Sequence, residues 1–266
     1  MALPPPTRNG AVVITGASAG IGTELARELA RRSYGVLLVA RRADRLTELA
    51  ADLVAEHGVD AGVEPCDLAD ATARDKLVAG LLEREFLGVC NNAGFGTLVN
   101  LAEADLGREQ QIVRLNVEAV HHLTGAFLPG MVERGAGAIL NVASTAAYQP
   151  LPGFATYAAS KAFVQSFSEA VHAELEGTGV SVTTLSPGFT RTEFVSTANA
   201  DEQGAALPGA LYMKAADVAK AGVEAMLAGR RTATPGLHNR ATTYGGRFVP
   251  RSLLLPLVKR ATRAPR

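Results

Sequence analysis

Short apolar runs alternate with longer amphipathic segments along most of the chain, and this alternation constrains the fold more than any other feature. Strand-like runs occupy residues 11–15, 36–40, 62–66, 88–91, 138–142, 180–185 and 231–235. Helix-like segments lie between them, at residues 20–32, 43–57, 69–85, 110–132, 155–176 and 215–228. Repeated strand–helix units with right-handed crossovers produce a parallel sheet covered by helices on both faces. We therefore expect a doubly wound α/β fold.

The chain length predicts how many domains this fold occupies. A chain of 266 residues suits one large α/β domain, and we find no internal repeat or linker that divides it. We expect a single domain over residues 1–246, followed by a basic, apolar C-terminal tail over residues 247–266.

The cysteine count and the hydrophobic pattern exclude several classes of protein. Two cysteines are too few for a disulfide framework and indicate a reducing compartment. No Cys/His cluster has the spacing of metal ligands, so we expect no metal. No apolar run has the length of a membrane span, and the first residues lack the layout of a signal peptide. We therefore expect a cytoplasmic protein.

Charge is unevenly distributed, although the net charge is zero. Nine of the 26 basic residues and none of the 26 acidic ones follow Glu224, so the body carries a charge of −9. The tail suits peripheral contact with an anionic membrane surface, packing on a neighbouring subunit, or covering a pocket. Its basic residues form no compact motif with interleaved aromatics, so we expect no nucleic-acid partner.

A glycine-rich turn joins the first expected strand to the first expected helix. Residues 15–22 contain the spacing Gly-x-x-x-Gly-x-Gly, with Gly16, Gly20 and Gly22. Backbone N–H groups and the helix dipole at such a turn point at a negatively charged ligand. Glycine also lets a pyrophosphate approach the backbone closely. Taken alone, the turn fits a nucleotide site and a plain tight connection equally well.

Tyr157 and Lys161 are four residues apart in an expected helix. This spacing places both side chains on one face, about 6 Å apart. A nearby ammonium favours the phenolate form, so the pair suits proton transfer near neutral pH. Taken alone, the pair fits a ring lying along a lysine stem better, and its meaning depends on the other motifs.

Six motifs in one order resemble the classical short-chain dehydrogenases/reductases. Residues 15–22 match the glycine-rich loop of that family, residues 91–94 its Asn-Asn-Ala-Gly element, and Pro187-Gly188 its Pro-Gly element. The family's catalytic tetrad is matched by Asn116, Ser144, Tyr157 and Lys161. The resemblance covers about residues 11–240. It implies a Rossmann-type, mainly seven-stranded sheet and an oxidoreductase that acts on CH–OH groups with NAD(P).

The resemblance also implies a role for each member of the tetrad. Tyr157 is the acid for reduction and the base for oxidation. Lys161 lowers the pKa of Tyr157 and binds the nicotinamide ribose. Ser144 holds and polarises the substrate oxygen, with a plain strand-end cap as the alternative. Asn116 supports a water that links Lys161 to solvent, or it only satisfies nearby backbone.

By the same resemblance, a second set of residues binds the cofactor. Asp67 accepts a hydrogen bond from the adenine amino group, caps the helix expected from residue 69, or does both. Thr192, rather than Thr190, supplies a hydroxyl for the carboxamide. The full expected set is Gly16, Ser18, Ala19, Gly20, Ile21, Gly22, Arg41, Arg42, Asp67, Leu68, Asn92, Ala93, Gly94, Tyr157, Lys161, Pro187, Gly188, Thr190 and Thr192.

Two arginines at the end of the second expected strand favour NADP(H) over NAD(H). Where an NAD site needs an acid, the chain has Arg41 and Arg42, and Asp44 is interpreted as a helix cap. A guanidinium binds a 2′-phosphate through charge-assisted hydrogen bonds. The alternative is two solvated arginines at a helix start, where the dipole disfavours cations. Ala19 lacks the basic residue that some NADP-dependent relatives carry there.

We expect the enzyme to interconvert a carbonyl and a secondary or primary alcohol. An apolar substrate is indicated by Phe95, Leu98, Leu151, Phe154, Phe189, Phe194 and Tyr212, although core packing explains several of them. Residues 193–212 suit a lid over the substrate, and the resemblance implies a homodimer or homotetramer that forms through helices 110–132 and 155–176. The alternatives are a nucleotide-binding sensor or scaffold without turnover and a membrane-surface protein that works through its tail.

Overall fold

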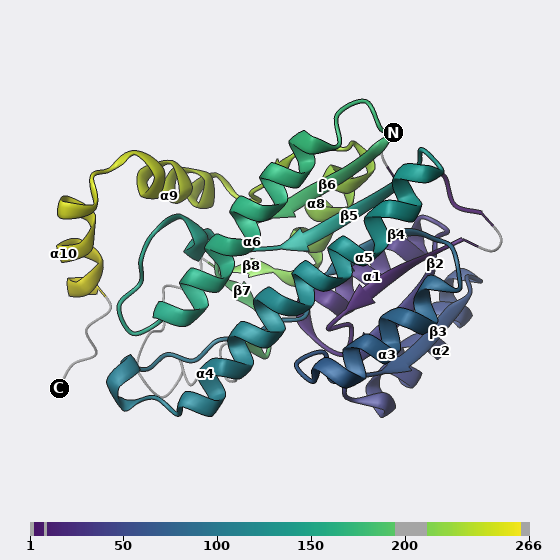
Figure 1. The fold of residues 1–266 in the computed structure, drawn as a ribbon, viewed down its shortest axis with the longest axis horizontal. Helices are drawn as coiled ribbons and strands as arrows, with labels where there is room; N and C mark the ends of the chain where they lie inside the picture. The colour runs from purple at the N-terminus through teal and green to yellow at the C-terminus, as the bar shows by residue number, and fades with distance from the viewer. Residues whose placement is uncertain (1–2, 8–9, 195–211, 262–266) are drawn as a thin grey trace.

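The centre of the molecule is a parallel sheet. In a computed structural model of the chain, residues 3–7, 10–194 and 212–261 are described, and the seven strands have the order β3-β2-β1-β4-β5-β6-β9 (Figure 1). The strands are β1 (Ala11–Thr15), β2 (Gly35–Ala40), β3 (Ala61–Pro65), β4 (Phe86–Asn91), β5 (Gly137–Val142), β6 (Val180–Leu185) and β9 (Thr232–Ala233). The winding reverses between β1 and β4, which creates a switch point there. The predicted doubly wound fold is confirmed.

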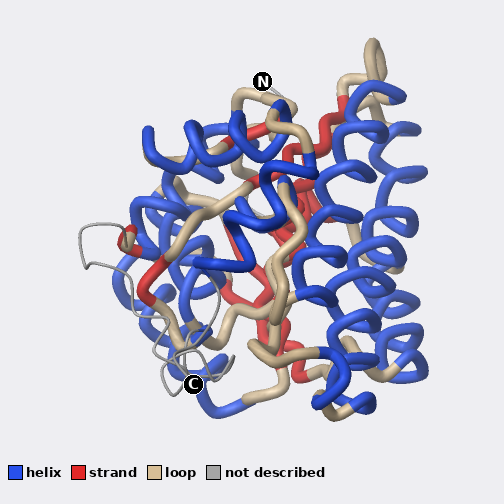
Figure 2. The backbone as a smooth tube through the Cα atoms, turned by 90° about the vertical axis from the view of Figure 1, so that its left-hand side faces the viewer, coloured by secondary structure: helices blue, strands red, loops and turns tan. Residues whose placement is uncertain are grey.

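Helices cover both faces of this sheet because successive side chains of a strand point to opposite faces. Val12 and Ile14 of β1 belong to one core, and Val13 belongs to the other. The first core is closed by α1 (Gly20–Arg31), α2 (Ala43–His57) and α8 (Ala215–Leu227). The second is closed by α3 (Ala71–Leu82), α5 (Ala119–Glu133) and α6 (Ala155–Glu174). Figure 2 shows the strands between these helical layers.

The helix expected over residues 110–132 has three parts and begins earlier. It consists of α4 (Leu106–Val113), a π-helical turn η2 (Arg114–Glu118) and α5. The early start has a local cause, because the Asp105 side chain accepts hydrogen bonds from the N–H groups of Gly107 and Arg108 and so caps α4. The other expected elements agree with the structure, and β1, β6 and α2 have the expected bounds.

The expected cap of α2 is wrong, and so is the alternative that Asp67 caps the following helix. The N-cap position of α2 is occupied by Arg42, and Asp44 lies inside the first turn. Helix α3 begins two residues later than expected, because Asp70 caps it by accepting a hydrogen bond from the N–H of Ala73. Asp67 therefore does not cap α3.

Several elements have no counterpart in the expectations. They are η1 (Leu101–Glu103), η3 (Thr145–Tyr148), the strand pair β7 (Thr190–Arg191) and β8 (Met213–Lys214), and the helices α9 (Leu237–Phe248) and α10 (Arg251–Ala261). Helices α9 and α10 project from the body at the left of Figure 1, and the tail expected from residue 247 begins inside α9. Of the expected lid, residues 195–211 lie outside the described residues.

Candidate active site

The carboxyl ends of the strands bring the sequence motifs to one edge of the sheet. Gly16 follows β1, Asn92 follows β4, Ser144 comes two residues after β5 and Gly188 comes three residues after β6. Since the ends of adjacent parallel strands meet at one edge, the motifs converge at the switch point. Every segment that contributes to the site is therefore positioned by the buried core of the sheet.

The glycine turn has a backbone that only glycine adopts readily. Gly16 has a φ of +67° and Gly20 a φ of +58°, values in the left-handed region that side chains disfavour. At Gly22, a Cβ atom would collide with the carbonyl oxygen of Gly16. The turn is also tied to β4, because the N–H groups of Asn92 and Ala93 both donate to Oγ1 of Thr15 at 3.0 Å.

Helix α1 begins directly after this turn with its N-terminal N–H groups uncapped by any side chain. Ala19 occupies the N-cap position and makes no side-chain cap hydrogen bond, and the first turn contains no acidic residue. Orphan N–H groups and the positive end of the helix dipole need a negatively charged partner. The turn therefore fits an anionic ligand such as a pyrophosphate.

Tyr157 and Lys161 lie next to each other, and both are buried. Their side chains are 8% and 4% exposed, and Nζ of Lys161 is 5.9 Å from the centre of the Tyr157 ring. Nζ donates a hydrogen bond of 2.8 Å to the carbonyl oxygen of Val142 at the end of β5. The spacing argument from the sequence thus agrees with the observed neighbourhood.

Burial dominates the acidity of this pair. Desolvation raises the pKa of Tyr157 to about 12, while a hydrogen bond with Ser144 acts in the opposite direction. Desolvation also lowers the pKa of Lys161 to about 8, because a buried ammonium loses its hydration. In the chain itself, burial therefore outweighs the lowering of the Tyr157 pKa that we expect from Lys161.

Asn116 lies in the π-helical turn and is fully buried. Its Oδ1 accepts a hydrogen bond from the N–H of Phe95 at 3.2 Å, and its Nδ2 donates to the carbonyl of Phe95 and to Oγ of Ser160, both at 3.0 Å. A Cβ atom at Gly94 would lie 3.0 Å from Oδ1 of Asn116 and 3.2 Å from Nζ of Lys161. Asn116 thus satisfies nearby backbone and also faces Lys161 across Gly94.

Ser144 and the two candidate threonines are fixed by local contacts. Oγ of Ser144 accepts a hydrogen bond from the N–H of Ala146 at 3.1 Å, so this serine caps η3 beside Tyr157. Thr190 turns back and donates to the carbonyl of Gly188 at 3.0 Å. Thr192 instead packs against the glycine turn, since a Cβ atom at Gly20 would lie 2.8 Å from its methyl carbon.

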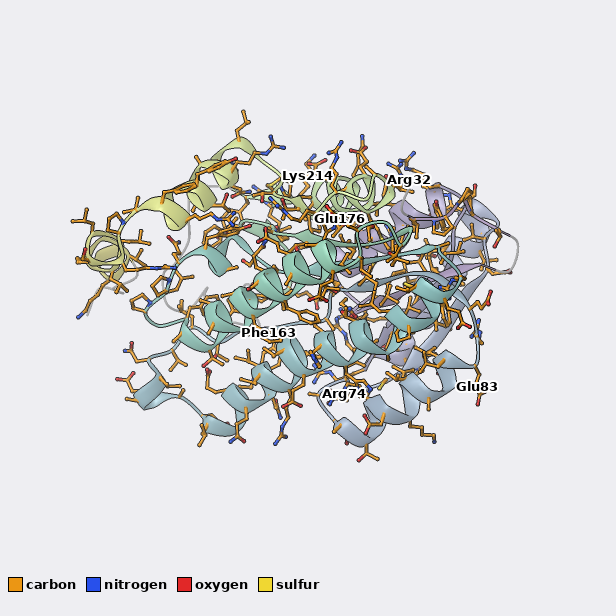
Figure 3. All side chains as sticks on the ribbon, turned by 45° about the horizontal axis from the view of Figure 1, so that its top comes forward. Arg32, Arg74, Glu83, Phe163, Glu176 and Lys214 are labelled. Carbon is orange, nitrogen blue, oxygen red and sulfur yellow. The ribbon has the colours of Figure 1, made fainter. Side chains whose placement is uncertain are left out.

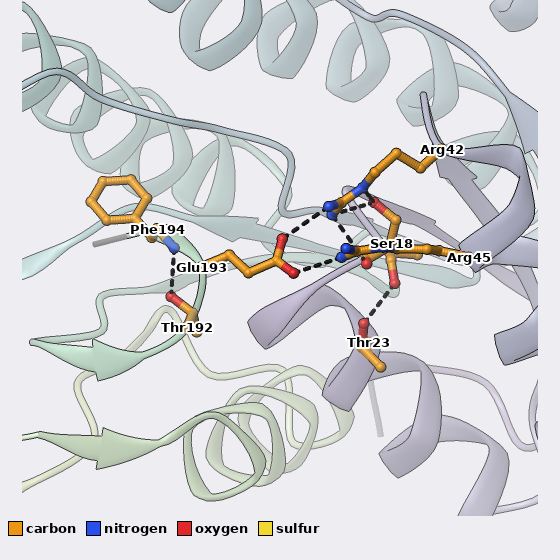
Figure 4. A network of polar contacts seen from close by, with 8 residues as sticks. Ser18, Thr23, Arg42, Arg45, Thr192, Glu193 and Phe194 are labelled. Carbon is orange, nitrogen blue, oxygen red and sulfur yellow. Dashed lines mark hydrogen bonds and ion pairs between the residues drawn. The ribbon is translucent and has the colours of Figure 1, made fainter. Parts of the chain in front are cut away.

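The two arginines that are expected to bind the cofactor have different surroundings. Arg41 is exposed, whereas Arg42 reaches the glycine turn and donates to Oγ of Ser18 at 3.0 and 3.1 Å and to its carbonyl oxygen at 3.1 Å (Figure 4). Arg42 also donates to Glu193 at 2.9 Å, and Arg45 donates to the same carboxylate at 2.6 Å. Sequence reasoning missed Arg45 and Glu193.

Asp67 and Leu68 lie just after β3 and are held by local contacts. Oδ1 of Asp67 accepts a hydrogen bond from the N–H of Ala69 at 3.0 Å. The Leu68 side chain is buried in the core, and its carbonyl accepts a hydrogen bond of 3.0 Å from Arg74, labelled on α3 in Figure 3. The Leu68 side chain therefore belongs to the core and does not line the site.

Two aromatic rings pack beside the ring of Tyr157. The ring centre of Phe154 is 4.6 Å and that of Phe194 is 5.2 Å from the centre of Tyr157. Phe189 and Tyr212 form a separate pair at 6.0 Å, and Phe95 packs under a guanidinium elsewhere. Of the apolar residues expected near the substrate, Phe154 and Phe194 therefore reach the tyrosine directly.

Comparison with known proteins identifies the family of this chain. Residues 10–203 match the sequence profile described as short chain dehydrogenase. The chain is 38% identical to sulfoacetaldehyde reductase 2 of Chromohalobacter salexigens over 218 residues, which are 79% of this chain and 85% of that protein. It is 34% identical over 187 residues to a very-long-chain 3-oxoacyl-CoA reductase of Anas platyrhynchos, covering 68% of this chain and 60% of that relative.

A solved structure extends the match over almost the whole chain. The short-chain dehydrogenase from Sphingobium yanoikuyae in complex with NADPH is 31% identical and covers 93% of this chain and 95% of its own, with a TM-score of 0.80. The chain belongs to the short-chain dehydrogenase family. It is an oxidoreductase that acts on alcohol and carbonyl groups and has the nucleotide-binding Rossmann fold of that family.

Helix α9 of this short-chain dehydrogenase supports the site from outside the sheet, which sequence reasoning also missed. Asn239 is buried and donates to the carbonyl of Pro235 at 2.7 Å, and it packs so closely on Gly188 that a Cβ atom there would collide with it. Near the other end of α9, a Cβ atom at Gly246 would lie 2.8 Å from the carbonyl oxygen of Tyr148 in η3. Helix α9 therefore backs both the Pro-Gly turn and the segment that begins at Ser144.

The described residues contain neither a metal site nor a membrane-spanning helix. No group of His, Cys, Asp and Glu side chains among them is placed to hold a metal ion. None of the helices within the described ranges is long and apolar enough to cross a membrane.

Proposed function

We propose that this short-chain dehydrogenase is an NADP(H)-dependent carbonyl reductase that also runs as an alcohol dehydrogenase. The observation that carries the proposal is the placement of Ser144, Tyr157 and Lys161 together at the strand ends, beside an uncapped glycine turn. When bound, the cofactor supplies the hydride. The chain must then hold the carbonyl oxygen and deliver a proton to it.

Tyr157 is the proton donor for reduction. With a pKa near 12 the phenol is fully protonated at neutral pH, and the alkoxide left by hydride transfer is basic enough to take that proton. Ser144, which interacts with the Tyr157 hydroxyl, holds and polarises the substrate oxygen. In the oxidation direction Tyr157 acts as the base.

Lys161 and Asn116 support this proton transfer. One N–H of the Lys161 ammonium is used by Val142, and an ammonium has three donors, so the others suit the ribose hydroxyls of the nicotinamide nucleotide. Asn116 faces Lys161 across Gly94, a position suited to holding a water that resupplies the proton from solvent.

The glycine turn and the surrounding strand ends bind the rest of the cofactor. The N–H groups at the N-terminus of α1, which have no side-chain cap, would hold the pyrophosphate. Asp67 and residues 92–94 would hold the adenosine half, and Thr192, which packs on the glycine turn at Gly20, would supply a hydroxyl for the carboxamide. We assign this nucleotide-binding domain to residues 1–246.

The preference for NADP(H) rests on Arg42. Its guanidinium lies against Ser18 of the glycine turn, at the start of α2, so it would hold the 2′-phosphate of an NADP-type nucleotide. A charge-assisted hydrogen bond contributes about 1.5–3 kcal/mol, which corresponds to about a ten- to hundredfold change in Kd. The NADPH-bound relative from Sphingobium yanoikuyae supports the same preference.

Fluorescence titration with NADPH and with NADH tests this preference. We expect tighter binding of NADPH by the unaltered enzyme, and Arg42→Ala should weaken NADPH about ten- to hundredfold while leaving NADH unchanged. Arg27→Ala is the control, because Arg27 lies on α1 and pairs with Asp52 at 3.8 Å. Tighter binding of NADH by the unaltered enzyme would contradict the proposal.

The substrate is proposed to be apolar, because Phe154 and Phe194 surround Tyr157. The named relatives do not agree on a substrate, since one is called a sulfoacetaldehyde reductase and another a very-long-chain 3-oxoacyl-CoA reductase. Comparing kcat/KM for aryl ketones with that for small charged aldehydes tests the proposal. Higher values for the charged aldehydes would overturn it.

A homodimer or homotetramer is proposed through α5 and α6. Phe163, labelled on α6 in Figure 3, is 38% exposed and stacks on Phe167 at 5.6 Å, and Phe167 contacts His121 of α5 at 5.4 Å. An apolar exposed cluster of this kind suits a subunit contact. Sedimentation velocity of the purified enzyme and of Phe163→Glu measures the assembly, and a monomer in both cases would contradict the proposal.

Peripheral membrane contact is proposed for the C-terminal helices. Leu237, Tyr244 and Phe248 share one face of α9 by their spacing and are 65–82% exposed, and nine basic residues lie between residue 230 and the C-terminus. An exposed apolar face with cations suits an anionic bilayer surface. Co-sedimentation with phosphatidylserine vesicles tests it, for the full chain, for a chain without residues 247–266 and for Tyr244→Glu, and equal sedimentation of all three would exclude the contact.

A further inference from the structure

The carboxylate of Glu193, which follows β7, lies between two arginines at the start of α2. Glu193 accepts a hydrogen bond from Nη1 of Arg42 at 2.9 Å and one from Nη1 of Arg45 at 2.6 Å (Figure 4). Glu193 is 151 positions from Arg42 and 148 from Arg45 in the sequence, so the contact exists only because the fold brings residue 193 close to the carboxyl end of β2. It joins the segment after β7 to the site proposed for the cofactor phosphate.

The start of α2 is a place where an anion is needed. Arg41, Arg42 and Arg45 stand at its first turn, with Asp44 as the acidic residue of that turn. The helix dipole is positive there, so this clustering of cations is unfavourable unless an anion offsets it. Hydrogen bonds from Arg45 and then Arg42 hold the pKa of Glu193 below its usual value, so Glu193 supplies that anion as a carboxylate at neutral pH.

A bound phosphate can take the place of the Glu193 carboxylate in this contact. The side chains of Arg42, Arg45 and Glu193 are 39%, 45% and 51% exposed, and ion pairs as exposed as these are weakened by water and salt. Arg42 keeps its bonds to Ser18 whether or not Glu193 is present, because they use other donors of its guanidinium. A phosphate dianion presents two oxygens to two guanidinium groups just as a carboxylate does, and carries more charge.

We propose that the Glu193 carboxylate occupies the 2′-phosphate subsite and is displaced by that phosphate, with Arg45 joining Arg42 as a second phosphate ligand. This inference rests on the proposed preference for NADP(H). It assigns opposite effects to two residues in cofactor discrimination. Arg45 strengthens binding of a 2′-phosphorylated nucleotide, and Glu193 weakens it by competition.

The test uses adenosine 2′,5′-diphosphate and 5′-AMP, which differ in the 2′-phosphate alone, with binding measured by calorimetry on the full chain. We expect Glu193→Gln to tighten adenosine 2′,5′-diphosphate about tenfold and Arg45→Met to weaken it about tenfold, with 5′-AMP unchanged in both. Asp52→Asn is the control for Glu193→Gln, because it makes the same change in net charge further along α2 and away from the cluster.

Three outcomes separate this inference from the proposal beneath it. If Arg42→Ala weakens adenosine 2′,5′-diphosphate but Glu193→Gln and Arg45→Met do not change its Kd, the displacement is wrong and the NADP(H) preference stands. If Glu193→Gln weakens the ligand, Glu193 positions the arginines instead of competing, which also overturns the inference. If Arg42→Ala has no effect, the NADP(H) preference itself fails.

Discussion

Burial of the Lys161 ammonium lowers the stability of the folded protein. The ammonium is 4% exposed, and desolvation lowers its pKa from 10.5 to about 8. A folded-state pKa below the unfolded value means that the unfolded chain binds more protons between these two pH values. At pH 7 the buried ammonium therefore destabilises the fold by about 3 kcal/mol, in exchange for a donor beside Tyr157.

Lys161→Met should consequently raise the free energy of unfolding at pH 7. The gain of about 3 kcal/mol is reduced by about 1 kcal/mol for the lost hydrogen bond to Val142, which leaves about 2 kcal/mol. The gain should be complete below pH 8 and should disappear as the pH rises to 10.5, because the unaltered protein becomes more stable over that interval. Urea unfolding at several pH values measures it.

Lys76→Met on the exposed face of α3 is the control for this experiment. Surface substitutions of this kind change stability by less than about 0.5 kcal/mol. A loss of stability in Lys161→Met, or a gain that does not vary with pH, would show that burial of the ammonium is not costly.

At the scale of single residues, the sequence predicts the chemistry better than the electrostatics. The tetrad stands out because each member has a fixed place in a motif, and the structure brings Ser144, Tyr157 and Lys161 together. The effect of burial on their pKa values depends on packing that no motif encodes. The Glu193 bridge to Arg45 was equally inaccessible, since nothing in the sequence indicates that residues 148 positions apart share a hydrogen bond.

At the scale of elements, the site depends on local irregularities. The π-helical turn η2 lies between α4 and α5 and contains Asn116, and such turns are frequent at functional sites. Helical periodicity over residues 110–132 predicts one continuous helix there, because a single π-turn does not interrupt the run of helix-compatible residues. The start of α4 could have been predicted from the sequence, since Asp105 is a favoured capping residue.

Helix α9 could not be predicted from local sequence. Its segment contains Gly245 and Gly246 and two threonines, which are poor helix formers. Tertiary contacts stabilise it instead, through Asn239 at the Pro-Gly turn and through the close approach of Gly246 to η3.

A pair of glycine substitutions tests the role of α9. Gly245→Ala should raise the free energy of unfolding by about 0.5–1 kcal/mol, because no atom lies within 4 Å of the added Cβ. Gly246→Ala should lower both the melting temperature and kcat, because its Cβ would press on the carbonyl of Tyr148 and displace the turn that holds Ser144. Thermal unfolding and carbonyl reduction assays measure the two effects. Equal behaviour of the two variants would show that α9 does not support the site.

At the scale of the whole molecule, the sheet explains why so much of the site was predictable. Parallel strands end at one edge, so motifs that follow β1, β4, β5 and β6 must meet there once the alternation of strands and helices is recognised. The reaction class follows once the glycine-rich turn and the residues of the tetrad lie together at that edge. The substrate does not, because aromatic residues of the core and of the pocket look alike in a sequence.

The most direct test of the whole account is the rate of NADPH oxidation with a panel of aryl and alkyl ketones, for the unaltered enzyme and for Tyr157→Phe. We expect turnover by the unaltered enzyme and a kcat about 10²–10⁴-fold lower in Tyr157→Phe, with the same Kd for NADPH and the same melting temperature. Undiminished turnover in Tyr157→Phe would contradict the role of the tyrosine. NADPH binding by the unaltered enzyme without turnover of any carbonyl would instead favour a nucleotide-binding sensor or scaffold.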